Sequence, residues 1–246
     1  MQNVRKKAPR IDSFNFKAGK LLRDRYEVVT RLGAGWEGEV YLIRERPTGI
    51  ERTAKFFFPE RNINDRAAIF YAKKLHKLRQ CPVVIQYYTQ DSIVYRGIPI
   101  TFLVSEFVEG ELLSRFLARQ PKKRLSPFQA VHLLHALASG IEVIHNMGEY
   151  HGDLHADNII VLRYGLGFEL KLLDMFHWGA PRGEHIHHDV LDLVRLFYDA
   201  LGGAKRYSHH PPEVKAICCG LKKRLILKKF RTAGQLRAYL ETMEWS

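Results

Sequence analysis

The stretch that decides the fold is His151-Gly152-Asp153-Leu154-His155-Ala156-Asp157-Asn158, which reads H-G-D-L-H-A-D-N. An aspartate follows the first histidine by two positions, and an asparagine follows that aspartate by five. Asp153 carries a carboxylate that can accept or orient the proton of an attacking hydroxyl. Asn158 offers a carbonyl oxygen, a ligand type that suits Mg²⁺. The stretch therefore predicts a catalytic loop with a base and a metal ligand.

A second metal ligand is predicted at the end of a later apolar run. The runs 159–162 and 170–173 are largely apolar, and Asp174 follows the second. Two strands joined by a glycine-containing turn would place Asp174 near Asn158. Magnesium prefers hard oxygen ligands and bridges phosphate oxygens, so this pair predicts a site for a metal-bound nucleotide.

A glycine-rich segment lies upstream of this loop. Residues 26–32 and 39–43 read as strands, and Gly33-Ala34-Gly35-Trp36-Glu37-Gly38 lies between them with G-x-G-x-x-G spacing. Glycine lets the backbone turn tightly and approach phosphates closely. A dinucleotide-binding loop would lead into a helix, whereas this one leads into a β-branched and aromatic strand. The context predicts a hairpin that covers phosphates.

Together these motifs resemble the protein-kinase-like superfamily, from about Leu22 onward. The resemblance implies an α+β, two-lobed fold. It expects an antiparallel five-stranded N-lobe with one helix over residues 21–105, a hinge over 106–110, and a mainly helical C-lobe with a short activation segment over 111–246. Residues 1–20 are polar and basic and are expected to form a flexible arm, with a docked segment from Phe14 to Phe16 as an alternative.

The resemblance also implies cofactors and residue roles. ATP and Mg²⁺ are the expected cofactors, with Asp153, Lys55 and His155 as catalytic residues and with Asn158 and Asp174 as metal ligands. The nucleotide-binding residues that it implies are Gly33, Gly35, Gly38, Val40, Ala54, Lys55, Glu106, Val108 and Glu111. For Glu111, a charge that favours a helix N-terminus is an equal alternative to a ribose contact.

The predicted helix over residues 64–78 departs from the family. The resemblance places on this helix a glutamate that pairs with the lysine, but the helix contains none, and the position falls near Tyr71. Lys55 is then positioned by Asp174 alone, by Glu60 or Asp65, or by a carboxylate from elsewhere. A catalytically weak site is the other alternative.

The catalytic loop departs as well. Gly152 stands where protein kinases carry an arginine that grips a phosphorylated activation loop, and His155 stands where serine/threonine kinases usually carry a lysine. Asp174-Met175-Phe176 replaces D-F-G, and no A-P-E follows. The H-G-D-L-H form resembles aminoglycoside and other small-molecule phosphotransferases and some bacterial sugar-lipid kinases. A peptide-docking platform and a phosphorylation switch are expected to be absent or short.

The segment 185–188, with three histidines, invites a metal hypothesis. The alternative is that Asp189 begins a helix and braces the backbone of the catalytic loop. The segment lacks a second ligand pair at zinc-like spacing, which favours the structural alternative.

The net charge and the composition of the chain limit which partners and which location are expected. The formal net charge of +13 favours acidic or phosphate-bearing partners. The chain has no apolar stretch long enough to span a membrane. Its three cysteines form no C-x-x-C pair, and its N-terminus lacks a signal-like apolar segment, so a cytoplasmic location is expected. Oligomeric state stays open.

The predicted function is ATP- and Mg²⁺-dependent phosphoryl transfer to a hydroxyl, with a serine/threonine protein kinase as the first choice. A protein substrate or a small hydroxylated acceptor is the expected partner. One alternative is a small-molecule or sugar-lipid kinase, and another is a nucleotide-binding pseudokinase that acts as a binding or scaffold protein. A basic protein that binds nucleic acid or anionic membrane is the third.

Overall fold

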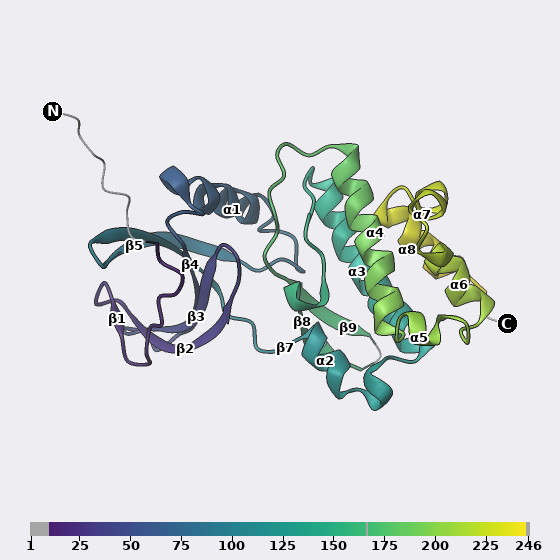
Figure 1. Ribbon diagram of the computed structural model, residues 1–246, viewed down its shortest axis with the longest axis horizontal. Coiled ribbons are helices and arrows are strands. Elements are labelled where there is room, and N and C mark those ends of the chain that lie inside the picture. The colour runs from purple at the N-terminus through teal and green to yellow at the C-terminus, as the bar shows by residue number, and fades with distance from the viewer. Residues whose placement is uncertain (1–9, 166, 245–246) are drawn as a thin grey trace. The chain divides into compact units, whose positions relative to one another are not determined.

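The computed structural model describes residues 10–165 and 167–244 of the chain. The chain divides into two compact units. Unit 1 comprises Met1–His76 and Gln86–Phe107, and unit 2 comprises Lys77–Ile85 and Val108–Ser246. Strands dominate unit 1 and helices dominate unit 2, which confirms the predicted two-lobed α+β fold (Figure 1).

Unit 1 is built on an antiparallel sheet with the strand order β1-β2-β3-β4-β6-β5. The strands are β1 (Leu21–Leu22), β2 (Tyr26–Ala34), β3 (Gly38–Glu45), β4 (Glu51–Phe57), β5 (Tyr87–Tyr95) and β6 (Ile98–Glu106). The expected five strands are present, and the two-residue β1 adds a sixth. Arg96 and Gly97 join β5 to β6 with φ values of 51° and 76°, as a tight two-residue hairpin turn requires.

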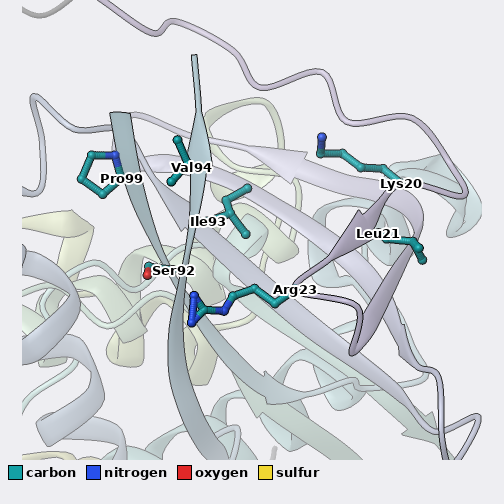
Figure 2. Close-up of a pocket in the computed structure, with 7 residues that line it drawn as sticks. All are labelled: Lys20, Leu21, Arg23, Ser92, Ile93, Val94 and Pro99. Carbon is teal, nitrogen blue, oxygen red and sulfur yellow. The ribbon is translucent and has the colours of Figure 1, made fainter. Parts of the chain in front are cut away.

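The sheet of unit 1 curls so that its two edges approach each other. An open pocket of about 290 Å³ lies between the edges (Figure 2). It is lined by Lys20, Leu21, Arg23, Ser92, Ile93, Val94 and Pro99. Arg23 near β1 and Asp91 on β5 form an ion pair at 3.4 Å across the same edges. None of the predicted nucleotide-binding residues lines this pocket.

The described part of the predicted flexible arm is docked. Ile11, Phe14 and Phe16 are buried in the core of unit 1, where Phe14 stacks on Phe16 at 5.4 Å between ring centroids. The backbone N–H of Phe14 donates to Glu39 on β3 at 3.2 Å, and the N–H of Phe16 donates to the Tyr41 hydroxyl at 3.2 Å. The docked alternative therefore describes the segment from Phe14 to Phe16, whereas residues 1–9 of the expected arm lie outside the described residues.

One long helix follows β4. After a short 3-10 turn (Ile63–Asp65), α1 runs over Arg66–Lys77. Ala68, Tyr71, Ala72 and Leu75 form its buried face, and Lys74 is buried beside them. Asp65 accepts hydrogen bonds from Asn62 Nδ2 at 2.9 Å and from Thr101 Oγ1 of β6 at 2.5 Å. These bonds hold the start of α1 on the sheet.

Unit 2 is mainly helical, and its helices α3 (Pro127–Asn146) and α4 (Gly183–Ala200) lie side by side (Figure 1). Its other helices are α2 (Leu113–Arg119), α5 (Ala204–Tyr207), α6 (Pro212–Cys218), α7 (Lys223–Lys229) and α8 (Ala233–Thr242). Ser126 and Gln129 form a capping box at the start of α3. A small sheet has the order β7-β8-β9, with β7 (Glu111–Leu112), β8 (Ile159–Tyr164) and β9 (Phe168–Leu172). Among the described residues, no helix is both long and apolar enough to cross a bilayer.

The segment 77–85 belongs to unit 2, although the sequence placed it in the N-lobe. Lys77 Nζ donates to the Gly148 carbonyl and to Glu149 Oε1, each at 2.9 Å. The N–H of Leu172 donates to the Val83 carbonyl at 2.6 Å, which ties this segment to β9. Val83 packs so closely on Gly140 of α3 that an added Cβ would lie 2.8 Å from its methyl group. Contacts distant in the sequence fix this boundary, so local patterns could not predict it.

Candidate functional site

The glycine-rich segment forms the tight β2–β3 hairpin. The strand β2 continues through Gly33, which pairs with Val40, and the N–H of Gly35 donates to the Gly38 carbonyl at 2.9 Å. A Cβ on Gly38 would lie 1.8 Å from the Phe56 carbonyl oxygen, so glycine is required there for packing against β4. Among the described residues, no heavy atom lies within 4 Å of a Cβ added to Gly33 or Gly35. Those two glycines therefore leave open space beside the hairpin backbone.

Lys55 lies on β4, next to this hairpin in the sheet, and its side chain is 11% exposed. Its Nζ forms an ion pair with Glu37 Oε2 at 2.9 Å, and it lies 4.6 Å from the centroid of the Tyr71 ring on α1. A buried ammonium is costly without such partners. Lys55 is therefore not a lysine that faces water. Sequence reasoning missed Glu37, whose only signal is a carboxylate inside the glycine-rich hairpin.

The remaining nucleotide-binding candidates of unit 1 lie on neighbouring strands. Val40 pairs with Lys55 and is partly exposed, whereas Ala54 pairs with Tyr41 and is fully buried in the sheet. At the end of β6, Glu106 exchanges two hydrogen bonds with the backbone of Gln86. The roles of these residues toward a nucleotide stay predictions.

The remaining two candidates, Val108 in the predicted hinge and Glu111 just after it, lie in unit 2. Val108 is buried, and Glu111 lies on β7. The Glu111 carboxylate accepts a hydrogen bond from Arg119 Nε of α2 at 2.8 Å. A ribose contact by Glu111 would have to share its oxygens with this arginine.

The backbone of the catalytic loop is held by one buried carboxylate. Asp189 on α4 accepts the backbone N–H of His151 at 2.7 Å and that of Gly152 at 2.8 Å. His145 Nε2 lies 3.0 Å from its Oδ2. Burial alone would raise the pKa of Asp189, but these hydrogen bonds and the nearby His151 outweigh it and hold the pKa below its usual value. The predicted brace is confirmed, although α4 begins at Gly183, upstream of the predicted start.

Asp153 presents its carboxylate outward, with half of its side chain exposed. Asn158 Nδ2 donates to the Asp153 carbonyl at 2.9 Å and to Asp153 Oδ2 at 3.2 Å. His155 Nε2 lies 3.5 Å from Asp153 Oδ2 and 3.0 Å from Asn158 Nδ2. The loop thus brings three predicted residues together around one accessible carboxylate.

Asn158 and Asp174 lie on adjacent strand ends, as predicted. Ile159 pairs with Leu172, and the N–H of Leu173 donates to the Asn158 carbonyl at 2.8 Å. The Nδ2 of Asn158 is directed at Asp153 and His155, so Oδ1 is the atom turned toward other ligands. A carboxylate and an amide oxygen form a hard donor set that fits Mg²⁺, which commonly takes few protein ligands plus water and phosphate.

The segment after Asp174 is fixed to the catalytic loop. The N–H of Phe176 donates to the His151 carbonyl at 2.9 Å, and Trp178 Nε1 donates to the Gly152 carbonyl at 3.0 Å. Gly152 has a φ of 82°, and a Cβ there would lie 2.9 Å from the Tyr150 ring and 3.1 Å from Trp178. Glycine is therefore required where the family carries arginine, and Trp178 occupies the adjoining space.

Two of the three histidines at the start of α4 make structural contacts. His185 stacks on Tyr150 at 4.3 Å between ring centroids, and His188 lies 3.4 Å from Asp192 one turn later. Among the described residues, no group of three or more His, Cys, Asp or Glu is arranged to hold a metal ion. Burial raises the pKa of Asp192 to about 6, against the opposing charge of His188.

Comparison with known proteins places this geometry in a family. The family model of the protein kinase domain matches residues 26–180, which include the hairpin, Lys55 and the catalytic loop. The solved kinase domain of Mycobacterium tuberculosis PknI matches with a TM-score of 0.63 and 17% identity, and the match covers 93% of this chain and 97% of that one. This likeness shows the fold.

Curated relatives give the same family. The serine/threonine-protein kinase pkn2 of Myxococcus xanthus is 31% identical over 63% of this chain and 18% of its own length. The putative cyclin-dependent kinase F-2 of Oryza sativa subsp. japonica is 28% identical over 61% of this chain and 46% of its own length. The matches thus span less than half of either relative. Because the family model covers well over half of the sequence, the chain belongs to the protein kinase domain family.

Proposed function

We propose that this chain is an ATP- and Mg²⁺-dependent serine/threonine protein kinase, which moves the γ-phosphate of ATP to a hydroxyl of a protein. The observation that carries the proposal is the exposed Asp153 carboxylate on a loop whose backbone is held by Asp189, with Asn158 and Asp174 at adjoining strand ends. The kinase names of the relatives support the same reaction.

Each part of the site has a defined task in this reaction. Asp153 takes the proton of the acceptor hydroxyl while a bond forms between that oxygen and the γ-phosphorus and the bond from this phosphorus to ADP breaks. Asn158 and Asp174 hold Mg²⁺, which when bound neutralises charge on the transferred phosphoryl group. His155 Nε2 lies 3.5 Å from Asp153 Oδ2 and helps to orient this carboxylate toward the acceptor hydroxyl.

The unit 1 residues bind the nucleotide in this proposal. Lys55 contacts the α- and β-phosphates, and the open space beside Gly33 and Gly35 admits phosphate oxygens to their backbone. The adenine ring forms hydrogen bonds with backbone groups near Glu106, and near Val108 in the predicted hinge.

A small hydroxylated acceptor is the second candidate. Its support is the short segment between Asp174 and Gly183, where Trp178 is held on Gly152. A longer activation segment, whose phosphorylated residue is bound by an arginine, would favour a peptide acceptor.

Partners and location follow from surface and thiol chemistry. The exposed basic side chains on and near α7 (Lys222, Lys223, Arg224, Lys228 and Arg231) favour acidic or phosphate-bearing partners. All three cysteines are free thiols, which fits a reducing cytoplasm.

The test is transfer of labelled γ-phosphate with Mg²⁺, with the protein itself, an acidic protein and a panel of small hydroxylated compounds as acceptors. Label on protein supports the protein kinase, and label on a small acceptor supports the second candidate. ATP binding without any turnover would contradict both and point to a pseudokinase. Salt-dependent binding to nucleic acid or anionic vesicles, in the absence of ATP binding, would favour the basic binding protein.

A further inference from the structure

The helix α1 offers no carboxylate to Lys55. Its twelve residues, Arg66–Lys77, contain neither Asp nor Glu. At the position where the family's glutamate would fall, the structure has Tyr71, whose ring centroid lies 4.6 Å from Lys55 Nζ. An aromatic face attracts an ammonium but carries no net charge, so it only partly replaces a carboxylate.

The β2–β3 hairpin supplies a carboxylate to Lys55 instead. Glu37 Oε2 lies 2.9 Å from Lys55 Nζ, and the two side chains are 28% and 11% exposed. An ion pair with this burial is less screened by solvent than a surface pair. It is also short enough for a charge-assisted hydrogen bond.

The backbone around Glu37 is fixed, so its side chain is well placed for a positioning role. The Glu37 carbonyl accepts the N–H of Phe58, just beyond β4, at 2.9 Å. The N–H of Gly35 donates to the Gly38 carbonyl at 2.9 Å and closes the hairpin. Gly38 must be glycine because β4 passes against it. Glu37, one residue before β3, and Lys55 on β4 are therefore held next to each other by the pairing of these strands.

We propose that Glu37 is the positioning residue of Lys55, with the Tyr71 ring as a second support, so that the glycine-rich hairpin and not α1 orients the phosphate-binding lysine. The inference rests on the proposed function. It follows that Lys55 is oriented whenever the hairpin is formed, whatever the position of α1. One element, the glycine-rich hairpin, then both covers the phosphates and positions Lys55.

The catalytic test compares Glu37→Gln, Glu37→Asp and the double variant Glu37→Gln/Tyr71→Glu, which moves the carboxylate to α1. Glu37→Gln is expected to lower kcat/KM for ATP by about 10- to 100-fold, with Glu37→Asp retaining part of the rate. The double variant is expected to recover at least half of the loss on a logarithmic scale. The control is Glu51→Gln, which removes a carboxylate from the exposed pair with Arg44 in the same sheet. Glu37→Gln within twofold of wild type, or equal to Glu51→Gln, would overturn the inference.

A second readout separates this inference from the proposed function. The rate at which an amine-reactive acylating reagent modifies Lys55 is measured by mass spectrometry against pH, with wild type and Glu37→Gln side by side. Loss of the carboxylate destabilises the ammonium, so the profile of Lys55 should move to lower pH by about one unit, while exposed lysines keep their profiles. An unchanged profile for Lys55 would overturn the pairing even if the wild type transfers no phosphate. A shifted profile with an inactive wild type would contradict the kinase proposal alone.

Discussion

At the scale of single residues, three buried charges shape the two units. Lys55 pairs with Glu37, Asp189 binds the backbone of the catalytic loop, and Glu39 anchors the N-terminal segment. The Tyr41 hydroxyl donates to Glu39, and burial together with this bond raises the pKa of Tyr41 to about 12. Buried polar groups remain stable only when they are paired in this way, so each pairing specifies a local geometry.

Asp189→Asn is expected to destabilise the protein by about 2–4 kcal/mol. The amide cannot accept two backbone N–H groups and the His145 ring as the carboxylate does, and buried donors would lose their partner. The shift in the urea unfolding midpoint measures the loss. Asp157→Asn, at an exposed position in the same loop, should change the stability by less than about 0.5 kcal/mol. Equal midpoints for the two variants would refute the brace.

Asp192 predicts a pH dependence of the opposite sense to that of an ordinary paired carboxylate. Its pKa rises from 3.8 to about 6 on folding, so the folded state binds more protons between these values, and the stability from this group falls as the pH rises through them. The free energy of unfolding of Asp192→Asn should therefore rise relative to that of wild type as the pH increases, by about 2 kcal/mol at neutral pH. Urea unfolding of both proteins from pH 4 to pH 7 measures this difference. Parallel stability curves would show that the Asp192 pKa is not raised.

At the scale of elements, short segments without regular secondary structure hold neighbouring parts of each unit in place. The segment from Phe14 to Phe16 holds β3 through Glu39 and Tyr41, and it packs its rings into the core. In unit 2, Phe176 and Trp178 bind the backbone of the catalytic loop. Because Trp178 lies against Gly152, this segment is held in place by contacts that require no phosphate.

Phe14→Ala tests the docked N-terminal segment. Phe14 is 2% exposed and contacts the rings of Phe16, Phe56, Phe58 and Tyr95. Removal of its ring should lower the free energy of unfolding of unit 1 by about 3 kcal/mol. Phe128→Ala is the control, because that ring is 68% exposed on α3. Thermal unfolding compares them, and an equal melting temperature for both variants would mean that the segment adds nothing to stability.

At the scale of the whole molecule, the sequence predicted the fold and the order of its parts. Local patterns of hydrophobic periodicity and of turn residues mark the glycine-rich hairpin, the strand that carries Lys55, the helix α1, the catalytic loop and the β8–β9 pair. All of these elements are present in the structure. What local patterns do not encode is the placement of the segment 77–85 and of the N-terminal segment, since contacts remote in the sequence decide both.

The candidate site was predictable in its residues but not in all of its pairings. The spacing from His151 to Asn158 predicted the loop and its asparagine, and the brace by Asp189 was anticipated. Glu37 was missed because its ion pair from the turn before β3 to Lys55 on β4 depends on register and rotamer, and the register of β3 on β4 appears only in the folded sheet. The glycine requirement at Gly152 likewise depends on Tyr150 and Trp178 in the folded protein.

The most direct test of the kinase activity is Mg²⁺-dependent transfer of γ-phosphate by wild type, Asp153→Asn and Asp157→Asn in parallel. Loss of the base should reduce transfer by at least about 100-fold in Asp153→Asn with ATP affinity retained, whereas the exposed neighbour Asp157→Asn should match wild type. Transfer by Asp153→Asn at more than a few per cent of the wild-type rate would contradict the assignment of Asp153. Failure of the wild type to transfer phosphate to any acceptor would contradict the kinase itself.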